Sequence, residues 1–251
     1  MTAVAALTER MVLGQLSEDL PFAILAAAGN FMVFNFALRN VFDTGSMSYP
    51  QYVLPVIIIQ VMSLGVLATV DHAAREQQSD FGIRLRTLPI SALVPLVARM
   101  LYCIFRGGLA LLAAVAVGYA FGFRMTGGVG YAAAFVVLVL VLTLALSLGA
   151  DALGAALSGS AVGKSGTASQ MLLVPQLTLI MLSTGMAPLD AFPDWLRPFV
   201  HYQPVSQLTE TMRGFSTGHV MVDNLAISLA WCGAMLVVFG VLAVRMQRRE
   251  P

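Results

Sequence analysis

Long runs without charged side chains alternate with short polar stretches along the chain. Each run has about 17 residues or more, which is enough for a helix to cross the hydrocarbon core of a bilayer. A helix also satisfies its backbone N–H and C=O groups internally, as a lipid environment requires. The pattern predicts an all-α membrane protein, one domain over residues 1–251, with six transmembrane helices. These helices are expected at 20–38, 44–70, 107–123, 125–150, 165–189 and 224–244.

Three segments outside these runs have a different character. Residues 1–19 place apolar positions at spacings of three and four among charged residues, which predicts a helix lying on the membrane surface. Residues 71–88 continue the second helix into a charged loop. Residues 187–214 are rich in aromatic side chains and prolines. Because the prolines break any long helix, we expect short helices here that dip into the membrane interface.

The composition supports a membrane protein. Apolar residues make up 58% of the chain and charged residues 11%, against roughly 45–50% and 25% in soluble domains. This balance excludes an ordinary soluble enzyme and a disordered protein. With 14 basic and 13 acidic residues, the chain has no positive excess with which to bind nucleic acid. Ten of the basic residues fall on the side of the membrane that holds both termini, which places the termini in the cytoplasm.

Three rival functions have weak support in the sequence. The segment 158–165 has its glycine one position too late for a phosphate-binding P-loop, and it follows a membrane helix instead of a strand. An intramembrane protease of the rhomboid type needs a histidine near Ser165, but His201 and His219 fall on the far side of the membrane. An ion-coupled secondary transporter needs ionisable groups in mid-membrane, and the six runs are nearly free of them.

Three charged residues lie at the expected membrane edge. Asp151 follows the fourth run, and Arg99 and Arg106 precede the third, seven residues apart and therefore on one helix face. An acidic group near the membrane is costly and is usually paired or functional. A structural ion pair, a coupling role and a proton relay all stay open for Asp151. Asp71 and His72 fit a solvated helix end.

The stretch 182–215 has the most specific pattern in the chain. It resembles the signature region of ABC-2 type exporter permeases, most nearly the daunorubicin-resistance subgroup, which includes actinobacterial permeases that export drugs or phthiocerol-type lipids. RLRTLPIS at 84–91 and Ala150-Asp151 match as well, in the same order along the chain. The matching elements of the signature are Gly185, Pro188-Leu189, Phe192-Pro193, Trp195-Leu196, Pro198-Phe199, Gln203-Pro204-Val205-Ser206 and Met212-Arg213-Gly214.

The resemblance implies one half of the membrane path of an exporter in a bacterial inner membrane. Two separate ABC ATPase subunits would bind ATP and Mg²⁺, and a second permease, identical or homologous, would complete the path. The chain itself would hold no catalytic residue, metal or cofactor. In such permeases a coupling helix after the second span docks on the ATPase, and residues 71–88 take that position. The residues that we expect to contact the ATPase are Arg75, Glu76, Asp80, Phe81, Arg84 and Arg86.

The resemblance also implies an outer lid and a central path. The re-entrant hairpin 187–214 would cover the path, with Pro188, Phe192, Pro193, Trp195 and Pro204 as its characteristic residues. The first, second and fifth spans would face the path, and their sparse polar content favours a hydrophobic drug or a complex lipid as cargo. Asn30, Asn35 and Gln60 could equally join helices by hydrogen bonds. The candidates for lining the path are Asn30, Asn35, Gln60, Gln170 and Gln176.

Overall fold

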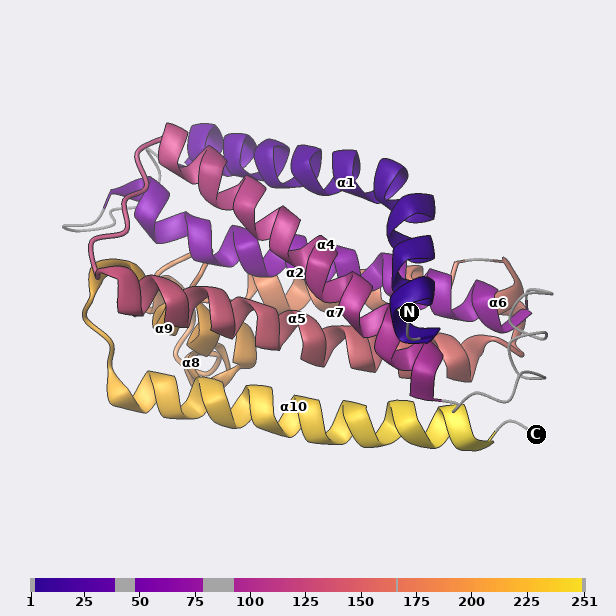
Figure 1. Cartoon of the computed structure of the whole chain (residues 1–251). Coiled ribbons are helices and arrows are strands. Elements are labelled where there is room, and N and C mark those ends of the chain that lie inside the picture. The colour runs from indigo at the N-terminus through magenta and orange to yellow at the C-terminus, as the bar shows by residue number, and fades with distance from the viewer. Residues whose placement is uncertain (1–2, 39–47, 79–92, 166, 250–251) are drawn as a thin grey trace.

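The computed structural model describes residues 3–38, 48–78, 93–165 and 167–249, and these form helices joined by short loops without a strand. Five long helices run along a common bundle (Figure 1). The long helices are α1 (Ala3–Leu38), α2 (Tyr49–Gln78), α4 (Leu93–Ala120), α5 (Val129–Leu157) and α10 (Val222–Arg249). The short ones are α6 (Ala161–Ser165), α7 (Gln170–Met181), the 3-10 turn η1 (Leu189–Ala191), α8 (Arg197–Tyr202) and α9 (Pro204–Thr217).

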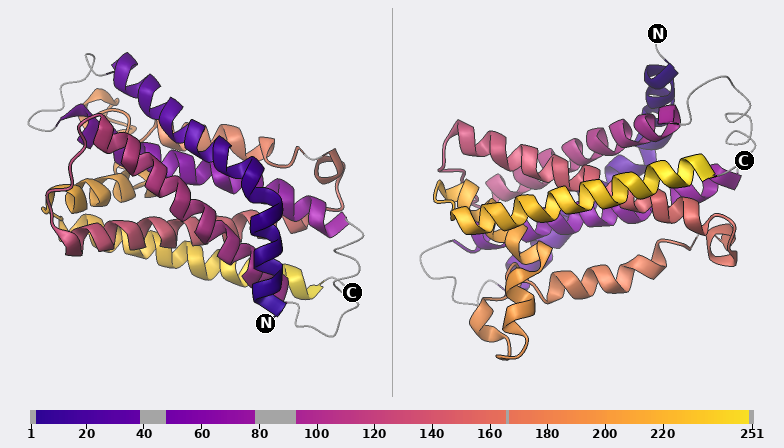
Figure 2. Two further views of the ribbon diagram at one scale, coloured as in Figure 1. Left: turned by 45° about the horizontal axis from the view of Figure 1, so that its top comes forward. Right: turned by 90° about the horizontal axis from the view of Figure 1, so that it is seen from below.

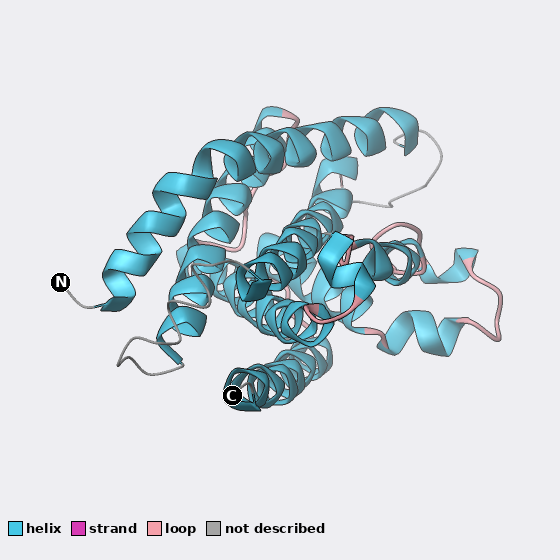
Figure 3. Ribbon diagram, turned by 90° about the vertical axis from the view of Figure 1, so that its right-hand side faces the viewer, coloured by secondary structure: helices cyan, strands magenta, loops and turns pink. Residues whose placement is uncertain are grey.

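The two ends of the bundle differ in what they hold. We call the end where α2 and α5 finish and the C-terminus lies the C-terminal end. The opposite end, where α2, α5 and α10 begin, is the hairpin end, because α9 joins it there: Thr126 donates its backbone N–H to the carbonyl of Ser216 at 2.8 Å. Figure 3 looks along the bundle from the C-terminal end and shows helices throughout its depth.

The all-helical class predicted from the sequence is confirmed, but six spans are not. Within the described ranges, four helices are long and apolar enough to cross a membrane, and they overlap the second, third, fourth and sixth expected spans. The first and fifth expected spans contain shorter apolar helices, Ile24–Phe34 and Gln170–Met181. The four long candidates are Tyr49–Glu76, Leu93–Ala120, Val129–Leu157 and Val222–Gln247.

The expected fifth span differs most from the structure. Helix α7 ends at Met181 instead of running to 189. The chain turns at Ser183, whose hydroxyl donates to the carbonyl of Ile180 at 2.6 Å, and the N–H of Thr184 then bonds to Ser206 in α9 at 3.0 Å. A side chain of α9 thus replaces the next helical hydrogen bond, which is a long-range contact that hydropathy cannot reveal.

Residues 1–19 and 20–38 form one helix instead of two separate elements. Figures 1 and 2 show that α1 bends, so that its N-terminal part runs across the bundle near the C-terminal end while the rest packs along α4. Pro21 lies within α1. Pro21 has no backbone N–H to donate to the preceding turn, and its ring clashes with a carbonyl of that turn. These two effects account for the bend.

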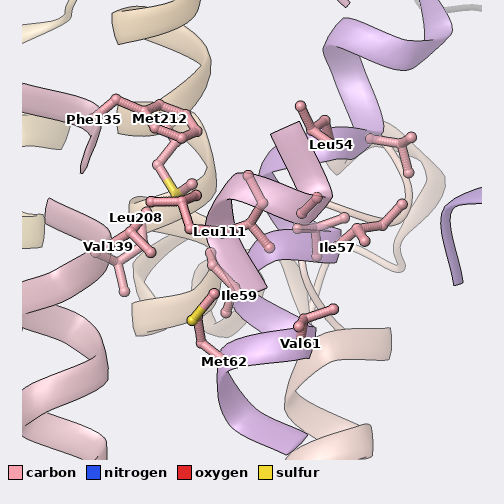
Figure 4. Packing of buried hydrophobic residues seen from close by; sticks show 14 of the residues in the cluster. Leu54, Ile57, Ile59, Val61, Met62, Leu111, Phe135, Val139, Leu208 and Met212 are labelled. Atoms are coloured by element: carbon pink, nitrogen blue, oxygen red, sulfur yellow. The ribbon is translucent and has the colours of Figure 1, made fainter. Parts of the chain in front are cut away.

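Helix α2 lies at the centre of the fold and contributes more buried hydrophobic residues than any other helix in the described part of the chain. Its Leu54 and Ile57 are fully buried, and Met62 nearly so. Figure 4 shows these residues beside Leu111 of α4, with Leu208 of α9 filling the space towards α5. Lipid is as apolar as such a core, so moving apolar surface from lipid into the core gains little free energy. Close packing and hydrogen bonds between helices therefore hold these elements together.

Candidate functional site

A buried ion-pair cluster joins four helices at the C-terminal end. Nε of Arg99 in α4 forms an ion pair with Oδ1 of Asp151 in α5 at 2.7 Å, and its Nη1 donates a hydrogen bond to Oε2 of Glu76 in α2, also at 2.7 Å. Gln247 of α10 donates to Oδ2 of Asp151 at 3.4 Å. Asp151 is fully buried, and Arg99 is 7% exposed. Since a buried charge is costly unless it is paired, this cluster fixes how the four helices meet.

Arg99 and Asp151 are paired in the structure, as expected, but Arg106 contacts α2 instead of Asp151. Arg106 donates through Nη2 to the carbonyl of Gly65 and to Oγ1 of Thr69 at 3.3 Å, both in α2. Helix α4 begins at Leu93, well before the start expected at 107, so both arginines lie inside a helix that can span the membrane. Their position at the membrane edge stays a prediction, and the structure changes only the pairing, since Arg106 contacts α2 instead of Asp151.

The expected ATPase contacts fall into three groups. Arg75 is exposed near the end of α2. Glu76 faces inward to Arg99, so its carboxylate already has a partner in this chain. Asp80, Phe81, Arg84 and Arg86 lie outside the described residues.

Asp71 caps helix α7 and is not the solvated helix end that the sequence suggests. Its Oδ1 accepts the backbone N–H of Ser169 at 3.0 Å, and its Oδ2 accepts the Ser169 hydroxyl at 2.6 Å. Ser169 immediately precedes the first residue of α7, so the carboxylate satisfies a free donor at a helix N-terminus. The two residues are 98 positions apart, and no local signal links them.

A cavity of about 590 Å³ separates α7 from α5 and α10. Helix α2 closes one side and the start of α9 closes another. Its lining is apolar except for Ser63 of α2 and Gln176 of α7. The Nε2 atom of Gln176 is buried and has no hydrogen-bond partner among the described residues. The volume falls within the range of about 300–1,000 Å³ that is typical of small-molecule sites.

The other polar residues expected along the path have different positions. Asn30 donates to the carbonyl of Ala26 in its own helix at 2.9 Å. Gln60 is buried in α2, and its Oε1 has no partner within the described part of the chain. Gln170 begins α7 and is exposed. Asn35 lies in α1, and its side chain is outside the described set. Of the five candidates, Gln176 lines the apolar cavity.

The segment expected to form the hairpin contains η1, α8 and α9, and whether it re-enters the membrane stays a prediction. Pro188 precedes η1, and Pro204 is the first residue of α9, where a missing N–H costs nothing. Phe192 ends η1, and its carbonyl accepts Nε of Arg197 at 3.0 Å. Trp195 is 80% exposed, and Pro193 beside it is exposed too.

Arg213 of α9 ties this hairpin to α2. Its guanidinium lies 3.6 Å from the ring centroid of Tyr52, its Nε donates to the Tyr52 carbonyl at 2.9 Å, and its Nη1 pairs with Glu210 at 2.8 Å. The Tyr52 hydroxyl donates to the carbonyl of Thr184 at 2.8 Å, and Nη2 of Arg213 reaches the same oxygen at 3.2 Å. Sequence reasoning treated Arg213 as part of a motif and missed Tyr52.

A second cavity of about 970 Å³ lies at this network. It is lined by Tyr52, His201, Glu210 and Arg213, and by the start of α10. Helix α9 therefore separates an apolar cavity, which meets Leu208, from a more polar one, which meets Glu210. The arrangement provides an apolar groove along the bundle and a second groove with more polar residues at the other end of α9.

Comparison with known proteins gives one family. The sequence model of the family described as ABC-2 family transporter protein matches residues 3–245. The probable doxorubicin resistance ABC transporter permease protein DrrC of Mycobacterium tuberculosis is 27% identical over 225 residues, which cover 87% of this chain and 76% of the relative. The doxorubicin resistance ABC transporter permease protein DrrB of the same species is 28% identical over 207 residues, covering 80% and 70%. The match over nearly the whole chain, together with the bundle of long apolar helices, shows that this protein belongs to the ABC-2 transporter family of membrane permeases.

Proposed function

We propose that this chain is the permease subunit of an ATP-driven exporter that moves a hydrophobic drug or a complex lipid out of the cytoplasm or the inner leaflet. The observation that carries the proposal is the apolar cavity along the bundle in a member of the ABC-2 family. Relatives named for doxorubicin resistance support a drug as cargo. The chain would lie in a bacterial inner membrane with both termini in the cytoplasm.

Contacts at the C-terminal end of α2 support a route by which ATP binding would move the helices around the apolar cavity. Asp71 holds the start of α7, and Glu76, five residues later, holds Arg99 and through it Asp151. A push on the end of α2 would therefore reach both the wall of the cavity and the ends of α4 and α5. In the proposed complex, the segment 71–88 docks on an ABC ATPase, through residues that include Phe81 and Arg84, and two discrete arrangements of the helices exchange on ATP binding.

The rest of the machinery would come from partners. Two ABC ATPase subunits would bind and hydrolyse ATP with Mg²⁺, and a second permease, identical or homologous, would complete the path. In this chain the hairpin with Pro188, Phe192, Pro193, Trp195 and Pro204 would cover the path on the outer side.

The experiment begins with the tagged chain, expressed from its native operon and purified in mild detergent. Mass spectrometry should find an ABC ATPase in stoichiometric amount, and Phe81→Ala with Arg84→Ala should reduce that amount while the chain still elutes as a sharp peak. Inverted vesicles should then take up doxorubicin in an ATP-dependent manner, and lipid analysis of the same vesicles tests the other cargo class. A chain that purifies intact without any ATPase would contradict the proposal.

A further inference from the structure

The hairpin end of the bundle is joined through main-chain atoms. The backbone N–H groups of Thr126 and Gly127, in the loop between α4 and α5, both donate to the carbonyl of Ser216 in α9, at 2.8 and 3.3 Å. The Thr126 hydroxyl donates to the same oxygen at 3.2 Å. Figure 1 shows this loop beside the link from α9 to α10. Two segments 90 positions apart are therefore joined backbone to backbone.

Two glycines allow this close approach. A Cβ on Gly127 would lie 2.5 Å from the carbonyl oxygen of Phe215 and 2.9 Å from the nitrogen of Gly218. Gly218 caps α9 with a φ of 82°, a left-handed conformation that favours glycine, and its N–H donates to the carbonyl of Gly214 at 2.9 Å. Because backbone atoms cannot rotate aside as a side chain can, the loop cannot slide along α9 while these contacts hold.

The start of α2 contacts both of these segments. The side chain of Gln51 donates to the carbonyl of Arg124 in the loop at 3.0 Å. Arg213 of α9 donates to the carbonyl of Tyr52 at 2.9 Å. Each of the three segments thus contacts the other two, so that none can move without breaking two of the contacts. We call this unit the hairpin-end block, and it consists of residues 51–52, 123–127 and 213–218.

The C-terminal end of the bundle is held by side chains instead. Arg99 pairs with Asp151 and with Glu76, each at 2.7 Å, and Gln247 of α10 reaches Asp151 at 3.4 Å. Long side chains can rotate and exchange partners while each helix keeps its own hydrogen bonds. A contact between two backbones changes only when the segments themselves separate. The bundle can therefore be rearranged more easily at its C-terminal end than at its hairpin end.

We propose, resting on the exporter function above, that the hairpin-end block is rigid and is the pivot of the movement that ATP drives. The C-terminal ends of α4 and α10 swing about it, while Arg99, Asp151 and Gln247 exchange partners. The hairpin end of a single chain keeps its shape through the whole cycle.

Hydrogen exchange on the purified chain alone, in mild detergent, tests whether the block is rigid. Peptides covering 121–128 and 213–218 should exchange slowly in the unaltered chain. Gly127→Ala places a methyl group against the backbone of α9 and should speed their exchange about tenfold. Gly130→Ala is the matched control, because nothing lies within 4 Å of its Cβ position, and should leave exchange unchanged.

Thr126→Val is a milder change that keeps the test valid if Gly127→Ala does not fold. It removes the hydroxyl donor but keeps the backbone N–H, and should speed exchange of the same peptides about threefold. Exchange in the unaltered chain as fast as in an unstructured segment would overturn the block, and so would equal exchange in all the variants.

Spin labels on the chain with its ATPase, in lipid nanodiscs, test the pivot. The two native cysteines are buried and are replaced by alanine. One pair of labels is placed at Ser48 and His219, which are exposed beside the block, and another at Val97 of α4 and Arg245 of α10, exposed towards the C-terminal end. Labelled chains are diluted with unlabelled ones, so that distances within one chain are measured. On addition of a non-hydrolysable ATP analogue, the first distance should stay constant and the second should shift.

The outcomes separate the pivot from the exporter function. A shift between Ser48 and His219 on addition of the analogue would overturn the pivot, and so would a constant distance between Val97 and Arg245. A chain with a protected block that never binds an ATPase would overturn the exporter function and keep the rigid block, because exchange is measured on the chain alone.

Discussion

The carboxylate of Asp71 accepts two hydrogen bonds from Ser169, one from its backbone N–H and one from its hydroxyl. This contact is the cap of α7, and it is supplied by α2 instead of by a residue of α7 itself. The helix that borders the apolar cavity is therefore attached directly to the helix that leads to the proposed ATPase contact.

Asp71→Ala should uncouple ATP hydrolysis from export. Loss of a helix cap costs about 0.5–2 kcal/mol, enough to change the position of α7 without unfolding the bundle. We expect export per ATP hydrolysed to fall about tenfold, because about 1.4 kcal/mol corresponds to that factor. Asp71→Asn keeps one acceptor oxygen and should lose less. Coupled transport and ATPase assays on the reconstituted complex measure both, and full coupling in Asp71→Ala would contradict the tether.

The ion pair of Arg99 and Asp151 makes a separate prediction about stability. Asp151→Ala leaves Arg99 buried with a single partner, and breaking a buried pair in this way costs about 3–5 kcal/mol. The double change Arg99→Met with Asp151→Leu removes both charges and should recover most of that loss, because Glu76 lies at the helix end with its side chain 19% exposed. Thermal unfolding followed by size-exclusion chromatography compares the three proteins. A double variant as unstable as the single one would show that the charges themselves are required.

The sequence predicts the parts of this fold that depend on local patterns, and it misses those that depend on contacts between residues far apart in the chain. Hydropathy alone locates α2, α5 and α10, because a charge-free run of that length has few other solutions. A charge-free run marks only residues 107–123 of α4, and the helix extends back to Leu93 through Arg99 and Arg106, whose partners lie in α2 and α5. Hydropathy also misses the end of α7, which depends on Ser206 of a different helix.

The candidate site shows the same division. Gln176 and Asp151 could be selected from the sequence because a polar residue in an apolar run is conspicuous. The role of Asp71, and Tyr52 altogether, could not be predicted, because their partners lie 98 and 161 positions away. Spacing along one helix carries no information about such pairs.

The contact of Arg213 with Tyr52 predicts unequal effects of two mild substitutions. Tyr52→Phe keeps the ring under the guanidinium and loses one hydrogen bond to Thr184, which costs about 1 kcal/mol. Arg213→Lys cannot reproduce the planar fork that reaches the Tyr52 carbonyl and Glu210 together, and should cost about 2–4 kcal/mol. Melting temperatures of the purified variants should therefore fall further for Arg213→Lys. A larger loss in Tyr52→Phe would mean that the hydroxyl, and not the cation, holds α2 to the hairpin.

Close packing of α5 on α2 predicts that one glycine has no tolerated substitute. A Cβ on Gly154 would lie 2.5 Å from the carbonyl oxygen of Val70 and 2.7 Å from Cβ of Ala73, and the backbone atom cannot turn aside. Gly154→Ala should therefore separate the two helices and cost about 1–3 kcal/mol. Gly233 in α10 has nothing within 4 Å of its own Cβ position, so Gly233→Ala is a matched control that should be neutral or stabilise by about 0.5–1 kcal/mol. Since Asp151 lies one helical turn before Gly154, the separation should also weaken the bond to Arg99. Adding Gly154→Ala to Asp151→Ala should then cost less than the sum of the two changes, whereas strictly additive melting shifts would show that packing and the ion pair are independent.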